Sequence, residues 1–477
     1  SAGGAFLNSE LTKVGQSGPM ATALASPLRS AAPAQTRDLR AFLTWLGCWL
    51  FLPNLPFLPI TLMGGPPRWR EIAACGVVGL AVHRWSYPLR LAAYLALMTY
   101  ITVNFIAHMF NMDTEMIMSV IGLVFDMDLL ASPEYIVGSA LLLASFGFAA
   151  VLLRRDSRFD GWKWSAAAAV LTIVYSAADL AITSDTMGSY TRIAPEGAPF
   201  TSATSQAHLA ALADGKANIM VILVEAMGEP RDPALRARQL AMWNRPELAG
   251  RFTMSHGETT YFGSTTSGEV RELCGRWGNY PEIVKPDPTC LPAILKARGY
   301  QTTSYHAFTS DFFERNRWYP LIGIDHSHFG PELLKRGAPL FHHVFTGACD
   351  RDNPPLIAAD LAKAKGPQFT YWVTLNSHLP TVANHDLGTD HCETYDARLN
   401  ADLPLVCRLF VIWDQAAAAL AKTISQPGFP PTDILIVGDH MPPFSQQKSR
   451  LAFEPDRVTW ILLRDKRLQA SPARSAR

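Results

Sequence analysis

The chain has 477 residues, of which 48% are hydrophobic and only 17% are charged, and its formal net charge is +1. This length allows more than one domain and a sizeable core. The near-neutral charge, with no basic stripe in the second half, argues against a nucleic-acid-binding protein. The long uncharged stretches lie within roughly the first 185 residues, so we expect a membrane domain followed by a globular domain.

Residues 1–36 are rich in Ala, Ser, Gly, Pro and Thr and show no apolar period, so a disordered leader is expected. The predicted transmembrane domain, residues 37–183, contains five apolar segments. Four of them approach the ~20 residues needed to cross ~30 Å of hydrocarbon. The second is shorter and also fits a core or re-entrant helix. The predicted spans are about 41–63, 71–82, 89–110, 135–153 and 164–182.

Loop charge predicts the orientation of these spans. Basic residues gather before the first span, between the second and third, and between the fourth and fifth, which lie on one side of a five-span bundle. The positive-inside rule places these loops in the cytoplasm and everything after the fifth span outside it. Arg68 and Arg70 fall on the outer side and depart from the pattern. The residues that support it are Arg37, Arg40, His83, Arg84, Arg90, Arg154, Arg155, Arg158 and Lys163.

The segment 113–130, between the third and fourth spans, carries acidic residues and no Lys or Arg. Its apolar part, 116–130, is too short to span a bilayer, so an amphipathic helix in the outer interface is predicted. The simpler interpretation is a helix that packs on the bundle. The alternative is a wall that guides a lipid headgroup toward the globular domain.

After a Ser-, Thr- and Ala-rich linker at 184–215, residues 216–477 alternate between apolar strand-like runs and helical stretches. This alternation predicts an α/β domain with a mainly parallel sheet and helices on both faces. In such sheets the ligand site lies beyond the carboxyl ends of the strands. The expected strands are 219–224, 301–305, 369–375, 434–437 and 458–463, and the expected helices are 233–243, 291–298, 355–365 and 409–423.

Carboxylates and imidazoles follow four of these strands. Glu225 ends the first, Asp439 and His440 follow the fourth, and His306 and His378 follow two others. A single polar residue at a strand exit usually only meets water, but four such exits on one sheet predict a common divalent cation. The mixture of carboxylate oxygen and imidazole nitrogen favours Zn²⁺ or Mn²⁺ over Ca²⁺.

Residues 262–269 form a run of Gly, Ser and Thr that predicts a turn leading into a helix. Hydroxyl groups there would lie at a helix N-terminus, where unpaired N–H groups favour anions. A hydroxyl beside a bound cation can be deprotonated near neutral pH and can attack phosphorus. Taken alone, such a run is most often just a turn.

The five cysteines of the globular half contain no C-x-x-C pair, which argues against zinc-ribbon and thioredoxin-like sites. In an oxidising compartment, Cys274 with Cys290 and Cys392 with Cys407 would close short disulfide loops, and Cys349 would be left over. Free buried thiols fit the sequence equally well.

Together these motifs resemble the sulfatase-like branch of the alkaline phosphatase superfamily over roughly residues 218–465. Within that branch the chain is similar to lipoteichoic-acid-synthase-type phosphoglycerol transferases, with phosphoethanolamine transferases as close relatives. The arrangement of five spans before an outward catalytic domain is similar too. The acidic segment at 113–120 and the loop around Cys392 and Cys407 look more like the phosphoethanolamine transferases.

The resemblance implies that Glu225, Asp439 and His440 hold the metal, and the turn that contains Asp439 and His440 is its most specific motif. It implies a nucleophilic threonine that also binds the metal. Thr266 matches that position best, with Thr265 one residue away.

The resemblance further implies contacts to the substrate phosphate from His306, Arg315 and His378. An aromatic residue precedes this arginine by two positions in the family. It is Trp in the synthases, and Phe313 stands there in this chain.

The implied protein is an enzyme of the bacterial inner membrane with a periplasmic catalytic domain. It would transfer phosphoglycerol from phosphatidylglycerol to an extracytoplasmic glycan or glycolipid through a phospho-threonine. A phosphoethanolamine transferase that uses phosphatidylethanolamine and modifies lipid A or a glycan is the alternative. A phosphodiesterase or sulfatase-like hydrolase is the second alternative, although the sulfatase motif Cys-x-Pro-x-Arg is absent. The intact motif residues argue against an inactive membrane scaffold.

Overall fold

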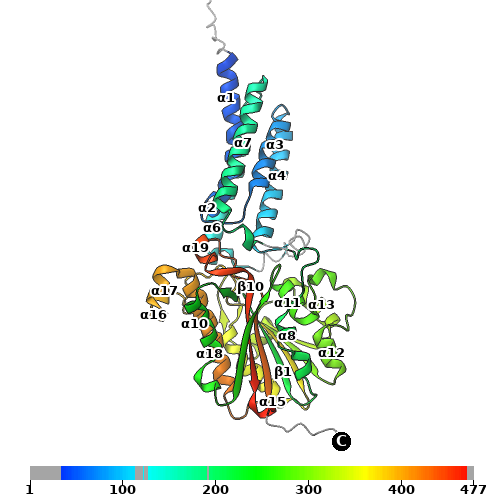
Figure 1. Cartoon of the computed structure of the whole chain (residues 1–477). Helices are drawn as coiled ribbons and strands as arrows, with labels where there is room; N and C mark the ends of the chain where they lie inside the picture. Colours follow the sequence, from blue (N-terminus) through cyan, green and yellow to red (C-terminus); the bar gives the residue numbers. More distant parts are fainter. Residues whose placement is uncertain (1–33, 113–121, 123–126, 191–192, 470–477) are drawn as a thin grey trace, which may run out of the picture.

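The computed structural model describes residues 34–112, 122, 127–190 and 193–469. Figure 1 shows a narrow bundle of helices joined to a broader α/β domain. Most of the predicted leader, 1–36, therefore lies outside the described residues, and its end already belongs to helix α1 (Ala34–Leu46). Most of the predicted interfacial segment, 113–130, lies outside them as well.

Four described helices are long and apolar enough to cross a membrane, and a bent helix pair makes up to five. Three of the four are α4 (Tyr87–Met109), α6 (Pro133–Leu152) and α7 (Trp162–Thr183), close to the predicted spans. In the fourth, α18 (Pro404–Ile424), 61% of an apolar 18-residue stretch is buried. This helix is therefore a core helix of the globular half. Three long apolar helices, the bent pair and the shorter α3 (Trp69–Val82) precede the α/β domain, which confirms the predicted fold class.

The first predicted span is broken in its middle. Helix α1 continues into a π-helical turn, η1 (Gly47–Phe51), and the chain resumes with η2 (Leu55–Phe57) and α2 (Leu58–Leu62). The two halves meet at 43°. Pro53 lies in the break, and its missing N–H and bulky ring account for the interruption.

The short second segment forms α3 (Trp69–Val82), whose 14 residues reach only about 21 Å at 1.5 Å per residue. Glycines let this helix approach its neighbours closely. A Cβ at Gly76 would lie 2.3 Å from Thr172 of α7, and one at Gly79 would lie 2.6 Å from Trp49. Small residues at helix contacts are typical of packing in a bilayer, where backbones must come close to gain attraction.

The buried position of Arg68 explains why it departs from the loop-charge pattern. Its side chain is only 3% exposed and lies over the Phe57 ring at 3.9 Å. It donates to Asn54 Oδ1 at 3.0 Å, and its backbone N–H donates to Asp179 Oδ2 at 2.7 Å. Glu71 is buried nearby as well. An arginine packed near two carboxylates inside the bundle is not a free loop charge.

The globular half is built on one eight-stranded sheet. Its strand order is β2-β10-β9-β1-β8-β4-β5, and β3 also pairs with β10. The strands from β9 to β5 are parallel to one another, and β10 runs antiparallel to β9, β2 and β3. The bounds are β1 Asn218–Val224, β2 Gly228–Pro230, β3 Phe252–Thr260, β4 Gln301–His306, β5 His326–Phe329, β8 Gln368–Val373, β9 Thr432–Gly438 and β10 Phe453–Asp465, with a small separate pair β6 Leu340–Phe341 and β7 Gly347–Ala348.

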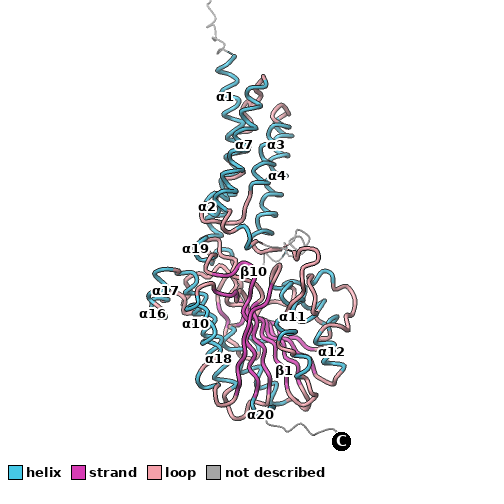
Figure 2. The backbone as a smooth tube through the Cα atoms, viewed as in Figure 1, coloured by secondary structure: helices cyan, strands magenta, loops and turns pink. Residues whose placement is uncertain are grey.

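Helices flank the sheet on either side, with α10 and α18 to the left and α11 and α12 to the right in Figure 1, and Figure 2 shows the strands between them. Strands β1, β8 and β9 are buried along their whole length, as central strands covered on both faces should be. The helices of this half are α8 Ala203–Gln206, α9 Leu209–Leu212, α10 Pro233–Trp243, α11 Thr265–Cys274, α12 Leu291–Ala297, α13 Arg315–Trp318, α14 Gly330–Lys335, α15 Asn353–Lys363, α16 Cys392–Tyr395, α17 Ala397–Asp402, α18, α19 Gln447–Arg450 and α20 Lys466–Gln469.

Two disulfides close short loops in the globular half. Cys274 pairs with Cys290, which joins the end of α11 to the start of α12. Cys392 pairs with Cys407, which joins α16 to α18. Cys349 is free and buried. Both predicted pairings are therefore present.

The two parts of the molecule meet at α19. The backbone N–H of Gln447 donates to the Met63 carbonyl at 2.5 Å, at the end of the broken first span. The Arg450 side chain is 1% exposed, donates to the Ser189 carbonyl at 2.7 Å and lies over the Tyr190 ring at 3.6 Å. A buried arginine thus ties the globular half to the segment that follows the last membrane helix.

We predict that Gly64→Ala weakens this contact. Gly64 has a φ of +85°, and a Cβ there would lie 2.5 Å from Gln447 Cβ. Gly197 is the control, because its φ is +76° but nothing lies within 4 Å of an added Cβ. The thermal midpoint of the detergent-purified chain should fall by several degrees more for Gly64→Ala than for Gly197→Ala. Equal midpoints would show that the contact adds nothing to stability.

Candidate metal centre and active site

Glu225, Asp439 and His440 converge where the neighbouring parallel strands β1 and β9 end. One ligand atom from each lies within 4.8 Å of the others. His440 Nε2 is 3.5 Å from Glu225 Oε1 and 3.3 Å from Asp439 Oδ2. All three residues are buried. Of the four strand exits that the sequence analysis singled out, the structure brings together the two that carry Glu225, Asp439 and His440, and His306 and His378 are not part of this group.

The turn after β1 holds Glu225 in place. Ala226 has a φ of 58°, which is costly for a residue with a Cβ, and its N–H donates to Asp439 Oδ1 at 2.8 Å. The Glu225 carbonyl accepts from Ser377 Oγ at 2.7 Å and from Trp413 Nε1 at 3.2 Å. These bonds hold the unfavourable turn and aim the Glu225 side chain at the other two ligands.

The donor set fits a divalent cation. Asp439 Oδ2 is buried and accepts no hydrogen bond from any residue that the structure describes. His440 Nδ1–H donates to the Met441 carbonyl at 2.9 Å, which leaves Nε2 as the ligand nitrogen. Two carboxylate groups and one imidazole nitrogen suit Zn²⁺ or Mn²⁺. Glu225, Asp439 and His440 are the residues that would hold such an ion.

Thr265, rather than Thr266, faces these ligands. Thr265 Oγ1 lies 3.1 Å from Glu225 Oε2 and 3.3 Å from His440 Nε2. Thr266 Oγ1 instead donates to Asn279 Oδ1 at 2.6 Å. Consecutive residues of a helix point about 100° apart, so at the start of α11 only one of the two hydroxyls can meet the cluster. The geometry therefore favours Thr265 over Thr266 as the hydroxyl beside these ligands, and the role of either threonine as nucleophile or metal ligand stays a prediction.

Arg315 and His306 lie together, but their polar atoms are bound by protein groups. Arg315 is 1% exposed and donates to the two Glu269 oxygens at 3.3 and 3.1 Å and to His306 Nε2 at 3.3 Å. His306 Nδ1–H donates to the Val373 carbonyl at 3.2 Å. Burial, and then the Arg315 charge, hold the pKa of His306 well below its usual value, so this imidazole is neutral. Their contact with a substrate phosphate stays a prediction.

Glu269, which anchors this group, was missed by the sequence analysis. It is fully buried on α11 and also accepts from the hydroxyls of Tyr319 and Tyr371, the latter at 3.3 Å. A signal was available, because the four-residue spacing from Thr265 to Glu269 places both on one face of a helix. Helix α11 therefore carries Thr265, which lies beside the candidate ligands, and the partner of Arg315 on the same face.

His378 lies at the border between the two parts of the molecule. Its ring centroid is 4.1 Å from that of Phe345 and 6.0 Å from that of Phe110, which caps the end of membrane helix α4. Its Nδ1–H donates to the Leu379 carbonyl at 2.9 Å. Burial is the main reason that the pKa of His378 is lowered to about 3. The ring is therefore neutral, with Nε2 as its acceptor nitrogen.

Phe313, the remaining predicted substrate contact, packs inside the domain. Its ring lies beneath the Arg315 guanidinium at 5.5 Å and beside Tyr280, with ring centroids 6.1 Å apart. The backbone of Phe313 is left-handed, with a φ of 57°. In this arrangement Phe313 supports Arg315, and a direct contact with substrate stays a prediction.

A protein-family model matches the part of the chain that contains most of these residues. Residues 249–466 match the family model described as Sulfatase, and the match contains Thr265, Asp439 and His440. This part of the chain is a sulfatase-family domain. The predicted sulfatase-like resemblance is thereby confirmed for these residues. Among curated proteins, none matches the chain.

Solved structures similar to the chain include a lipoteichoic acid synthase and two transferases. The lipoteichoic acid synthase LtaP from Listeria monocytogenes is 14% identical, with 59% of this chain and 70% of that chain covered and a TM-score of 0.38. The Streptococcus pyogenes phosphoglycerol transferase GacH, in complex with sn-glycerol-1-phosphate, is 17% identical, with 55% and 77% covered and a TM-score of 0.34. The lipooligosaccharide phosphoethanolamine transferase EptA from Neisseria meningitidis is 12% identical, with 90% and 88% covered and a TM-score of 0.41. The family assignment rests on the family model rather than on these likenesses.

The crowded carboxylates of Glu225 and Asp439 predict a distinctive pH dependence. Burial, and then the Asp439 charge, raise the pKa of Glu225 well above its ordinary value of 4.5. Above pH 4.5 the folded chain therefore keeps a proton that the unfolded chain has released. The contribution of Glu225 to stability falls as pH rises from 4.5 through the raised pKa, because there the folded state binds more protons. A bound dication replaces that proton and removes the penalty.

Thermal midpoints in a chelator, compared between wild type and Glu225→Gln across pH, measure this contribution. We expect the variant to gain stability over wild type as pH rises, because its amide has no proton to lose. Added Zn²⁺ or Mn²⁺ should raise the wild-type midpoint and leave the variant nearly unchanged. A midpoint difference that does not vary with pH would contradict the raised pKa.

Proposed function

We propose that this protein transfers a phospho-headgroup from a membrane phospholipid to an acceptor hydroxyl outside the cytoplasm, through a phospho-threonine at Thr265. One observation carries the proposal: the Thr265 hydroxyl lies 3.1 Å from Glu225 and 3.3 Å from His440, within a buried set of cation ligands. The helices that precede the sulfatase-family domain would hold it at a bilayer surface. A bacterial inner membrane with a periplasmic catalytic domain is the location that we propose.

The reaction requires one displacement at phosphorus in each half. A divalent cation held by Glu225, Asp439 and His440 would supply a Lewis acid that favours loss of the Thr265 proton to water and offsets phosphoryl charge. Thr265 Oγ1 attacks phosphorus, the bond to diacylglycerol breaks, and the departing oxygen takes a proton from water. The acceptor hydroxyl then attacks the same phosphorus, loses its proton, and returns the threonine oxygen as a hydroxyl.

Several groups around Thr265 support a phosphoryl group. The threonine opens α11, whose first N–H groups favour an anion at the helix end. The positive charge of Arg315 partly offsets the rise in the pKa of Glu225, so it acts on the same group of ligands. His378 offers a neutral acceptor nitrogen to a hydroxyl of the headgroup or of the acceptor.

Phosphatidylglycerol is the donor that we favour, with a glycan or glycolipid as acceptor. The glycerol headgroup carries no charge beyond its phosphate, whereas ethanolamine carries an ammonium that needs an anionic partner in a buried site. Glu269 is already engaged by Arg315, Tyr319 and Tyr371, so it is not available to an ammonium. Phosphatidylethanolamine remains the alternative donor, favoured by the loop that the Cys392–Cys407 disulfide closes.

Ester-sulfate hydrolysis is a weaker candidate despite the name of the family model. The residue beside the cation ligands is a threonine, and the formylglycine-precursor motif Cys-x-Pro-x-Arg does not occur in the sequence. A phosphodiesterase differs from the proposed transferase only in that water takes the place of the acceptor hydroxyl.

Replacing Thr265 and Thr266 separately tests the proposed nucleophile. Thr265→Ala should abolish the covalent phospho-adduct and slow headgroup transfer by roughly 10³-fold or more. Thr266→Ala removes a hydroxyl that faces Asn279 and should retain the adduct. Intact-mass and peptide-level mass spectrometry of the full chain in detergent, with phospholipid and Zn²⁺ or Mn²⁺, measures both. An adduct that survives in Thr265→Ala and disappears in Thr266→Ala would restore the position that the sequence predicted.

The mass of the adduct identifies the donor. With vesicles of phosphatidylglycerol we expect a phosphoglycerol adduct on Thr265, and with vesicles of phosphatidylethanolamine alone we expect none. An adduct formed only from phosphatidylethanolamine would reverse the choice of donor. Release of free glycerol phosphate whatever glycan is offered would assign a hydrolase instead of a transferase.

A further inference from the structure

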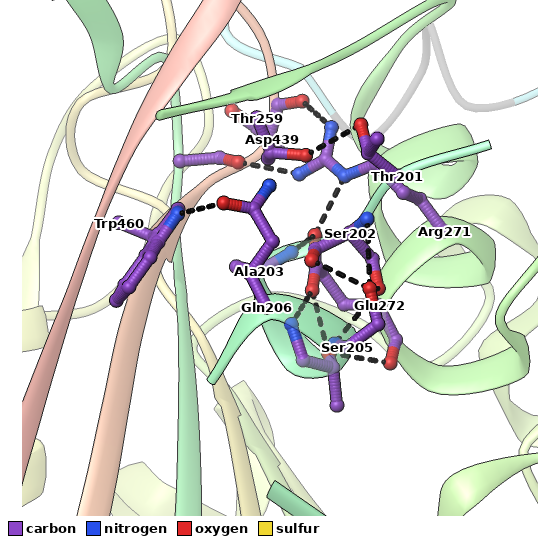
Figure 3. A network of polar contacts seen from close by, with 12 residues as sticks. Thr201, Ser202, Ala203, Ser205, Gln206, Thr259, Arg271, Glu272, Asp439 and Trp460 are labelled. Carbon is purple, nitrogen blue, oxygen red and sulfur yellow. Dashed lines mark hydrogen bonds and ion pairs between the residues drawn. The ribbon is translucent and has the colours of Figure 1, made fainter. Parts of the chain in front are cut away.

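Arg271 reaches from the helix that carries Thr265 to the turn that carries two of the cation ligands (Figure 3). Its Nη1 donates to the Asp439 carbonyl at 3.0 Å, and its Nη2 donates to the Gly438 carbonyl at 2.7 Å. Its Nε donates to Glu272 Oε1 at 2.7 Å. The Arg271 side chain is 1% exposed and that of Glu272 is 0% exposed. The guanidinium thus donates hydrogen bonds to the backbone of the ligand turn and to its own counter-ion.

Helix α11 and the ligand turn touch as closely as their backbones allow. A Cβ at Gly268 would lie 3.0 Å from Asp439 Cβ and 3.1 Å from its Cα. On the other side of the turn, a Cβ at Gly438 would lie 1.9 Å from the Met227 carbonyl oxygen. Such contact resists closer approach but does not set the direction of the turn. The two hydrogen bonds from Arg271 supply that direction.

Glu272 extends this network to the linker that follows the membrane helices. Its carboxylate accepts the backbone N–H of Ala203 at 3.2 Å and that of Thr204 at 2.8 Å. The Thr204 hydroxyl lies 2.5 Å from the same carboxylate and 2.8 Å from the Glu272 carbonyl. Gln206, in the same short helix α8, accepts from Trp460 of β10 at 3.1 Å. The linker is therefore held by hydrogen bonds to α11 and to β10.

We propose that Arg271 is a positioning residue for cation binding, and that Glu272 ties this position to the linker. Arg271 acts through the carbonyls of Gly438 and Asp439, which orient Asp439 and His440 toward Thr265. This role rests on the metal site of the proposed function. A buried ion pair costs desolvation that apolar side chains would avoid, so stability alone is a poor reason for it. Its directional bonds to the ligand turn provide a better one.

Arg271→Lys tests the proposal in the detergent-purified full chain. Lysine keeps the charge, but its single ammonium cannot bond two carbonyls and Glu272 in the planar arrangement of a guanidinium. Competition with a chelator for Zn²⁺ should show an affinity that is lower by roughly 10- to 100-fold, the usual effect of losing a group that orients a metal ligand. This readout requires no phospholipid and no turnover.

Arg251 provides a matched control in the same domain. It is also largely buried and donates to the carbonyls of Ile424 at 2.8 Å and Phe429 at 2.6 Å, with Asp465 as its counter-ion. Asp465 ends β10, which runs antiparallel to β9, so this arginine lies at the opposite edge of the sheet from the site. Arg251→Lys should lower the thermal midpoint and leave the Zn²⁺ affinity unchanged.

Two results would overturn the positioning role: an Arg271→Lys chain with wild-type Zn²⁺ affinity, or an equal loss of affinity in Arg251→Lys. If Arg271→Lys does not fold, Glu272→Gln takes its place, because it leaves Arg271 without its counter-ion. A lower Zn²⁺ affinity in that variant supports the proposal, and an unchanged one overturns it. A wild-type chain that binds Zn²⁺ but forms no phospho-threonine would overturn the transferase alone, so the two failures are distinguishable.

Discussion

The repulsion between two buried carboxylates is the constraint on which the rest of the site depends. Glu225 and Asp439 present ligand atoms within 4.8 Å of each other and of His440, away from water. Like charges so close in a medium of low polarity cannot both remain ionised without compensation, so a proton or a cation must lie among them. Because the hydroxyl of Thr265 enters the same space, whatever balances those charges also controls the reactivity of that hydroxyl.

The parallel sheet brings these two carboxylates together. The sequence shows which residues end each strand, but it does not show which strands are neighbours. Strands β1 and β9 are continuous apolar runs that end in acidic residues, so their exits are visible in the sequence. Their adjacency is not visible, because it depends on a strand order in which β9 pairs with β1 across more than 200 residues, with Val224 opposite Gly438. Strand β3 was missed for a related reason: among the described strands it pairs only with β10, it is partly exposed and its sequence is polar, so no apolar alternation marks it.

The choice between Thr265 and Thr266 shows where a motif stops being informative. A motif fixes position only to within a residue, whereas the face of a helix changes by about 100° at each step. Glu269, Arg271 and Glu272 were also hidden, because charged residues on a short helix normally predict a solvated face. Their burial follows from partners that are distant in sequence, such as Arg315 and Gly438. A sequence displays the residues of α11, but only the fold shows that nearly all of them point inward.

The placement of the globular half against the helix bundle is set by three groups of contacts. Arg450 is buried against Ser189 and Tyr190, Phe110 at the end of α4 lies against His378, and Glu272 holds the linker at Thr204. Because His378 follows β8, the carboxyl edge of the sheet faces the membrane bundle, as the relative placement of the two parts in Figure 1 also shows. A flexible tether would leave a lipid headgroup and Thr265 to meet by chance. In the proposed reaction, a docked domain would instead present Thr265 to the plane in which the headgroups lie, so the donor could react without leaving the bilayer.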